Sequence, residues 1–286
     1  SMCADRVGGK GLLYVVATPI GNLRDITLRA LEVLKEADLI LCEDTRTTRK
    51  LLTYYQISGK RLRSLYKDNE AQRVPEVLEA LRRGWKVALV SEAGTPSISD
   101  PGALLVREVR KAAFAVVPIP GPSALTTFLS VSGWDLSKGF MFLGFPPTRK
   151  TERRKLLQHL RDYPYPMVFF VPPHRLRIFL REALEILGDR SVVLGHELTK
   201  MHEEVRSFSL REAGEYFETT VPKGEYILLL EGRSGEPNLS LEEILAAIED
   251  LRRKGYPLKE AVKEMARRYG LSSKALYALA LHRKRG

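Results

Sequence analysis

Short apolar runs alternate with amphipathic segments along most of the chain. The run 12–17 is apolar throughout and ends at turn residues, which is typical of a buried strand. Residues 28–36 follow with apolar positions at helical spacing, and Thr27 is placed to cap that helix. Further strands are predicted at 39–42, 62–65, 86–90, 113–118, 140–143, 167–171, 192–196 and 226–231. Further helices are predicted at 69–83, 103–111, 121–130, 149–160 and 176–187, and from Leu210 after its cap Ser209. This order predicts an α/β fold.

The pattern changes twice, and each change suggests a domain boundary. We expect a tag and disordered tail at 1–10, an N-terminal α/β domain at 11–119, a second, more mixed α/β domain at 120–233 and a basic helical module at 234–286. A linker is predicted at 233–239, which contains a glycine and a proline. Helices are predicted beyond it at 241–254, 257–269 and 272–283. The last two are joined by Gly270-Leu271 with Ser272 as a cap, a spacing that resembles a helix-turn-helix.

Charge points to a polyanionic partner. The chain has 286 residues, a formal net charge of +11 and a pI near 9.6. A surplus of this size favours nucleic acid, because cations that neutralise phosphates release bound counterions, although simple solubility is the alternative. From Ser240 onward there are 11 Lys and Arg against 6 Asp and Glu. The terminal residues Arg283, Lys284 and Arg285 are therefore candidate RNA contacts, unless they form an ordinary solvated helix face.

Cysteine and histidine usage excludes several classes of protein. The two cysteines, Cys3 and Cys42, do not make a disulfide framework and suit a reducing cytoplasm. The five histidines show no metal-ligand spacing, so we expect no structural metal. No apolar run reaches the roughly 18 residues that a membrane span requires, and the first residues lack an apolar signal core.

Three loops rich in glycine and proline follow predicted strands. They are Ala17–Asn22 (ATPIGN), Ser91–Gly102 (SEAGTPSISDPG) and Pro118–Ser123 (PIPGPS). Ligands of open α/β sheets bind beyond the carboxyl ends of the strands, and such loops expose backbone groups there. The three loops therefore predict one shared pocket, although each could be an ordinary turn on its own.

Eight segments occur together in order between Gly11 and Gly232. They are ATPIGNL at 17–23, EDTR at 43–46, SEAGTPSISDPG at 91–102, PIPGPSA at 118–124, LGFP at 143–146, HR at 174–175, ELTK at 197–200 and KGE at 223–225. In this order the chain resembles the tetrapyrrole-methylase superfamily. It is similar to the branch that methylates the 2′-oxygen of a cytidine ribose in 16S ribosomal RNA, at the decoding centre of the small subunit. Lys274–Tyr277 (KALY) extends the resemblance into the helical module.

The resemblance implies two αβα domains with S-adenosylmethionine in a cleft between them, commonly in a homodimer. It also implies cofactor contacts, largely through backbone, in the second and third loops and at two further positions. These residues are Ser91, Ala93, Gly94, Ile98, Asp100, Pro122, Ser123, Ala124, Leu125, Phe170 and Leu198.

The sequence departs from the pattern of the RNA branch at three places. Phe170-Val171 stands where Tyr-Glu is usual, so a carboxylate is absent there. His196 replaces a common arginine, and Glu92 replaces an aspartate.

Methyl transfer to a ribose hydroxyl requires alignment of the reacting atoms and is helped by a base. The candidate catalytic residues are Asp44, Glu197 and Lys200; Lys200 could act as a neutral base or remain charged and hold a phosphate. Alternatively, Asp44 caps the helix that follows it, and Glu197 with Lys200 forms a surface pair. Candidate RNA contacts beside the loops are Arg24, Arg46, Arg49 and Arg175. Tyr54, Tyr66 and Phe145 are candidates for stacking on the cytosine.

Three functions follow from these residues. The first is an RNA ribose methyltransferase that acts on 16S RNA or on the small subunit. The second is a tetrapyrrole C-methyltransferase of the same fold, which would require neither the basic module nor the high net charge. The third is a non-catalytic RNA-binding protein of ribosome assembly.

Overall fold

The structure is a computed structural model that describes residues 10–99, 101–233 and 239–285, apart from the side chains of Lys284 and Arg285. All but the last residue of the predicted tail thus lies outside the described residues. The chain forms two compact units. One comprises Ser1–Phe128 with Glu197–Glu203, and the other comprises Leu129–His196 with Glu204–Gly286. The segment Glu197–Glu203 packs with the first unit, although the strands on either side of it belong to the second.

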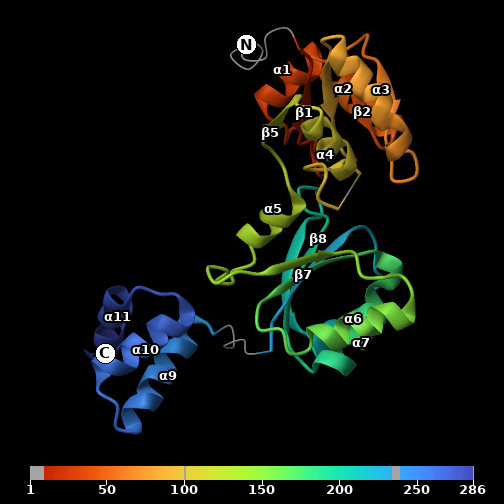
Figure 1. The fold of residues 1–286 in the computed structure, drawn as a ribbon. Helices are drawn as coiled ribbons and strands as arrows, with labels where there is room; N and C mark the ends of the chain where they lie inside the picture. The colour runs from red at the N-terminus through yellow and green to blue at the C-terminus, as the bar shows by residue number, and fades with distance from the viewer. Residues whose placement is uncertain (1–9, 100, 234–238, 286) are drawn as a thin grey trace. The chain divides into compact units, whose positions relative to one another are not determined.

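The first unit is built on a parallel five-stranded sheet with the order β3-β2-β4-β1-β5. Its strands are β1 (Leu12–Val16), β2 (Leu39–Cys42), β3 (Leu62–Ser64), β4 (Lys86–Leu89) and β5 (Ala115–Ile119). Helices α1 (Leu28–Glu36) and α2 (Thr45–Tyr54) share an apolar core with one face of the sheet. Helices α3 (Glu70–Arg82) and α4 (Ala103–Lys111) share a core with the other face, and α5 (Ala124–Ser130) follows β5. The first unit therefore has the three-layer arrangement expected of it (Figure 1).

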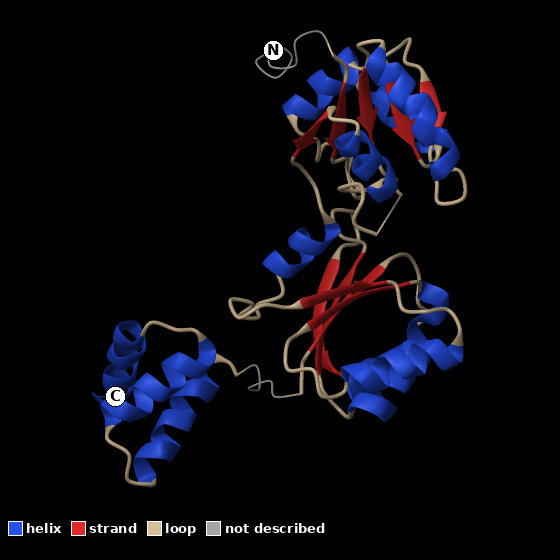
Figure 2. Ribbon diagram, in the orientation of Figure 1, coloured by secondary structure: helices blue, strands red, loops and turns tan. Residues whose placement is uncertain are grey.

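The second unit contains a mixed five-stranded sheet with the order β6-β7-β10-β8-β9. Its strands are β6 (Met141–Gly144), β7 (Met167–Val171), β8 (Ser191–His196), β9 (Glu204–Ser209) and β10 (Tyr226–Leu230). The β6–β7 pair is parallel and the other pairs are antiparallel. Helices α6 (Lys150–Leu160), α7 (Pro173–Leu187) and α8 (Leu210–Thr219) share one apolar core with this sheet (Figure 2).

A buried ion pair joins two helices of this core. The guanidinium of Arg153 on α6 donates to both carboxylate oxygens of Glu182 on α7, at 2.6 and 2.8 Å. Both side chains are at most 5% exposed. The third nitrogen of the Arg153 guanidinium donates to the backbone carbonyl of Thr148. The bidentate geometry orients α6 against α7 while it keeps both charges compensated.

Most predicted elements are confirmed, but one strand was not predicted and two helix starts are wrong. Strand β9 was missed, because its exposed and half-buried residues carry little apolar signal. Helix α7 begins at Pro173, and therefore His174 and Arg175 lie in its first turn and not in a loop; proline is favoured at that position. Helix α5 begins at Ala124, three residues later than expected. The caps Thr27 and Ser209 are confirmed.

The basic module is a three-helix unit with its own apolar core. It consists of α9 (Leu241–Arg253), α10 (Leu258–Tyr269) and α11 (Ser273–Arg285). Gly270 ends α10 in the left-handed conformation (φ 63°), which favours glycine. The hydroxyl of Ser272 accepts from the N–H of Ala275, as expected of the cap of α11. The helix-turn-helix spacing predicted from the sequence is thus present.

Candidate functional site

The three Gly/Pro loops meet at the carboxyl ends of the strands of the first sheet. Thr18 and Gly94 form an antiparallel bridge, with N···O distances of 3.0 and 2.9 Å. The hydroxyl of Thr95 donates to the carbonyl of Pro122 at 3.2 Å. Gly94 has φ of 79°, and a Cβ placed there would lie 3.3 Å from Ile20. The prediction that these loops come together is confirmed.

The loop between β4 and α4 is held closed by its own side chains. The hydroxyl of Ser91 lies 3.1 Å from each of the carbonyl oxygens of Ala93 and Gly94. Ser97 has φ of 71°, a conformation that few residues other than glycine adopt. Gly102 has φ of 134°, and a Cβ placed there would lie 2.5 Å from the Ser97 hydroxyl oxygen. The loop is therefore tightly folded, with its backbone fixed at both ends.

Glu70, on α3, anchors the far end of this loop and was missed by the sequence reasoning. One of its carboxylate oxygens accepts from the backbone N–H groups of Gly102, Leu104 and Leu105, at 2.9, 3.1 and 3.3 Å. Glu70 is 8% exposed. A carboxylate in this position satisfies the free donors of the first turn of α4 and is stabilised by the helix dipole. No local sequence pattern predicts this contact, because Glu70 and the start of α4 are about thirty residues apart.

The segment between β8 and β9 packs against the first loop. A Cβ at Gly21 would lie 2.8 Å from the hydroxyl oxygen of Thr199 and 3.0 Å from both the Leu198 carbonyl oxygen and the Lys200 Cε. Only glycine therefore allows this approach. Glu197 and Thr199 have φ of 52° and 69°, and such strain in a β-branched residue is unusual. The tertiary packing of the loop must maintain this conformation.

Within this segment, Lys200 and Glu197 form an ion pair. Their Nζ and Oε2 atoms are 2.9 Å apart, and their side chains are 39% and 18% exposed. The backbone N–H of Thr199 donates to the carboxylate of Glu203 at 2.8 Å, which closes the turn. The structure thus places both candidate catalytic residues beside the first loop in one packed turn.

Asp44 has the structural role considered as an alternative. Its carboxylate accepts from the backbone N–H of Arg46 at 2.9 Å and caps α2. It also accepts two bonds from the Arg46 guanidinium, at 3.2 and 3.0 Å. These hydrogen bonds from Arg46 lower the pKa of Asp44. Asp44 is therefore a weaker base than an isolated aspartate.

A small cavity lies under the first loop. It has a volume of about 60 Å³ and is lined by the buried residues Thr18, Thr48 and Ser91, together with Glu92 and apolar side chains. A space of this size holds about two water molecules. It is far smaller than the volume of a nucleoside cofactor. The buried hydroxyl oxygens of Thr18, Ser97 and Thr199 have no hydrogen-bond partner among the described residues. The loops and the turn thus contain hydroxyl groups whose hydrogen bonds are not satisfied by other described residues.

The other candidate residues divide between the two units. Nine candidate cofactor residues lie in the first unit: Ser91, Ala93, Gly94, Ile98, Pro122, Ser123, Ala124, Leu125 and Leu198. Asp100 lies outside the described residues. Phe170 lies on β7 of the second unit, where its ring centroid is 5.4 Å from those of Phe142 and Phe145. Tyr54, Tyr66 and Phe145 are exposed, at 54%, 42% and 60%.

The candidate RNA contacts are also dispersed. Arg24, Arg46 and Arg49 are exposed on the first unit. Arg175, on α7, donates to the carbonyl of Thr148 at 3.0 Å. In the module, Arg283 pairs with Glu242 at 3.3 Å, and the side chains of Lys284 and Arg285 lie outside the described residues.

Among the described residues, no group of three or more His, Cys, Asp or Glu side chains is placed to hold a metal ion. No helix in this part of the chain is long and apolar enough to cross a lipid bilayer.

The chain is similar to a known protein family and to several named proteins. The profile of the Tetrapyrrole (Corrin/Porphyrin) Methylases matches residues 12–214. A protein of Thermotoga maritima named ribosomal RNA small subunit methyltransferase I is 48% identical over 78% of this chain and 99% of its own length. Proteins of the same name from Halalkalibacterium halodurans and Neisseria meningitidis serogroup B are 41% and 43% identical, over 94% and 97% of this chain and 94% and 95% of their own lengths.

Solved structures share the fold. The methyltransferase CobJ has a TM-score of 0.58 at 21% identity, covering 80% of this chain and 97% of its own. Diphthine synthase has a TM-score of 0.62 at 16% identity, covering 78% of this chain and 90% of its own.

Proposed function

The chain belongs to the tetrapyrrole (corrin/porphyrin) methylase family, and we propose that it methylates the 2′-hydroxyl of a cytidine ribose in 16S ribosomal RNA. The methyl donor is S-adenosylmethionine, and the site is in the decoding centre of the small subunit. Three relatives that share 41–48% identity over most of this chain carry the name of a small-subunit RNA methyltransferase. The net charge of +11 suits a substrate that is a polyanion.

The observation that carries the proposal is the convergence of three Gly/Pro loops with the Glu197–Lys200 turn in the first unit. The backbone of Ser91–Thr95 and of Pro122–Leu125, with Leu198, would hold the cofactor. The unpartnered hydroxyls of Thr18, Ser97 and Thr199 fit a ligand that brings its own polar groups. When bound, S-adenosylmethionine supplies an electrophilic methyl group, and the protein therefore mainly has to align the atoms and exclude water.

The Glu197–Lys200 pair is the better candidate for the acceptor side of the reaction. A ribose hydroxyl must give up its proton, and a carboxylate within hydrogen-bond reach can accept it. Glu197 is paired with Lys200 in a turn that packs against the first loop, whereas Asp44 caps α2, is bound by Arg46 and has a lowered pKa. Lys200, charged beside Glu197, would orient the substrate by contact with an oxygen of the ribose or phosphate. Arg24, Arg46 and Arg49 would hold neighbouring phosphates.

Replacement of Lys200 by alanine tests this assignment. We expect Lys200→Ala to abolish methyl transfer and to leave binding of S-adenosylmethionine within several-fold, because the cofactor contacts are largely to backbone. Lys35→Ala, on the exposed end of α1, is the matched control and should transfer methyl groups normally. Full turnover by Lys200→Ala would remove this residue from the catalytic set.

The reaction itself is tested with labelled cofactor and small subunits that lack the modification. Label on one ribose 2′-oxygen is the expected result. Cofactor binding without labelled RNA, together with labelled tetrapyrrole, would replace the proposal by tetrapyrrole C-methylation. Absence of cofactor binding, with RNA bound, would leave a non-catalytic assembly protein. We also propose a cytoplasmic homodimer, whose mass in sedimentation should be twice the 32.3 kDa of the chain.

A further inference from the structure

The arginines and the lysines of the helical module differ in their ion pairing. Arg267 and Arg268 both pair with Glu264, at 2.7 and 2.9 Å. The other paired arginines are Arg252 with Glu249, Arg253 with Asp250 and Arg283 with Glu242. The lysines Lys254, Lys259, Lys263 and Lys274 are exposed, and none makes an ion pair with another described residue. The cations of the described module that make no ion pair are thus its lysines, whereas Arg267 and Arg268 share one carboxylate.

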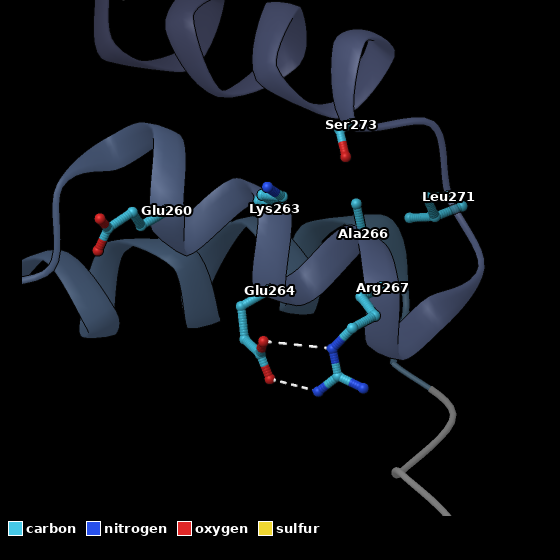
Figure 3. Close-up of a pocket in the computed structure, with 7 residues that line it drawn as sticks. All are labelled: Glu260, Lys263, Glu264, Ala266, Arg267, Leu271 and Ser273. Atoms are coloured by element: carbon cyan, nitrogen blue, oxygen red, sulfur yellow. Dashed lines mark hydrogen bonds and ion pairs between the residues drawn. The ribbon is translucent and has the colours of Figure 1, made fainter.

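One of these lysines lines a groove between α10 and α11, and two more lie next to it along the chain. Lys259 and Lys263 are four residues apart on α10 and therefore share a face of that helix. Lys263 lines a groove of about 470 Å³ together with Leu271 and Ser273, and Lys274 follows Ser273 at the start of α11. The same groove is lined by Glu260, Glu264, Ala266 and Arg267. Figure 3 shows that Glu264 and Arg267 pair with each other, so their charges compensate.

Apolar and aromatic side chains are exposed beside the lysines. Leu271, in the turn between the helices, is 41% exposed, and Tyr277 is 36% exposed. Tyr277 lies three residues after Lys274 and therefore on the same side of α11. We define the lysine face as Lys259, Lys263, Lys274 and Tyr277. It combines free cations with a ring, the two kinds of group that contact phosphate and unpaired bases of RNA.

We propose that the lysine face is a second RNA-binding surface of this protein, separate from the residues that carry methyl transfer. It would bind the phosphate backbone of the ribosomal RNA that flanks the target. The module lies outside residues 12–214 that match the methylase family, and we assign it to substrate binding and not to chemistry. This inference rests on the proposed RNA substrate. It assigns the main contact to the lysine face, whereas Arg283 on α11 is already paired.

The test is the salt dependence of binding to a 16S RNA transcript by the full-length chain. The variant carries Lys259→Gln, Lys263→Gln and Lys274→Gln together. Each phosphate contact contributes about 0.7 to 0.9 to the slope of log K against log salt, and loss of three should lower the slope by about 2 to 3. Affinity at moderate salt should fall by about tenfold or more.

The matched control removes three charges elsewhere, with Lys35→Gln, Lys111→Gln and Lys155→Gln on α1, α4 and α6. It should keep the wild-type slope, because local contacts and not overall charge set this quantity. Circular dichroism checks that both variants fold, and a Lys263→Glu variant should weaken binding further than Lys263→Gln. Equal slopes for the lysine-face variant, the control and the wild type would overturn the inference and leave the proposed function standing. Failure of the wild-type chain to bind either the transcript or small subunits that lack the modification would overturn both.

Discussion

Glu70 offers the sharpest test of how the site is assembled. Its carboxylate accepts three backbone N–H groups at the start of α4, and two of these bonds are buried. Replacement by alanine leaves these donors without the carboxylate and removes a negative charge from the positive end of a helix. Loss of a helix cap costs about 0.5 to 2 kcal/mol, and loss of a partly buried charge at a helix terminus costs up to about 2 kcal/mol. We therefore expect Glu70→Ala to lower the free energy of unfolding by about 0.5 to 4 kcal/mol.

The assay is thermal unfolding followed by titration with S-adenosylmethionine. For domains of this size, 1 kcal/mol shifts the midpoint by about 2 to 4 °C, and the expected decrease is thus about 1 to 16 °C. At a temperature well below both midpoints, the cofactor should bind several-fold more weakly. The reason is that Gly102, the end of the Ser91–Gly102 loop, loses its anchor.

Glu79→Ala is the matched control on the same helix. Glu79 pairs with Arg82 and Arg83 on the surface, where ion pairs contribute about 0 to 1 kcal/mol. If Glu70→Ala were no less stable than Glu79→Ala, the anchoring role would be refuted. If it were unstable but bound the cofactor normally, the loop geometry would not depend on Glu70.

The buried pair and the close approach of the loops give two more predictions. Glu182→Gln should destabilise the protein by about 3 kcal/mol, because Arg153 is left buried without its partner. The Arg153 hydrogen bonds lower the pKa of Glu182, so the pair stabilises the fold above the unfolded pKa of about 4.3. This difference between wild type and variant should shrink as pH falls through the folded pKa, which melting curves at a series of acidic pH values would detect. Gly21→Ala should cost about 1 to 3 kcal/mol and impair methyl transfer, since its Cβ would meet Thr199 at 2.8 Å. Gly214→Ala, with open space around it inside α8, should instead stabilise by about 0.5 to 1 kcal/mol in the same denaturation assay.

The sequence predicted which loops form the site, but it did not predict the contacts of single residues within them. The apolar runs and Gly/Pro loops indicated that three strand ends share a pocket, and the bridge between Thr18 and Gly94 confirms it. Local chemistry also identified Asp44 as a possible cap, which it is. The pattern could not locate the Glu197–Lys200 turn, because that segment lies between two strands of the second sheet and packs in the first unit.

The sequence alone determined what depends on neighbours along the chain. Strand and helix periodicity, the caps Thr27, Ser209 and Ser272, and the helix-turn-helix spacing are local properties, and they were predictable from a few consecutive residues. Tertiary structure decided the contacts between distant segments. These include the contact of Glu70 with the start of α4, the need for glycine at Gly21, and which cations of the module make no ion pair. The physical reason is that a polar side chain shows its type in the sequence, whereas its partner is set by the packing of elements that the chain brings together only when folded.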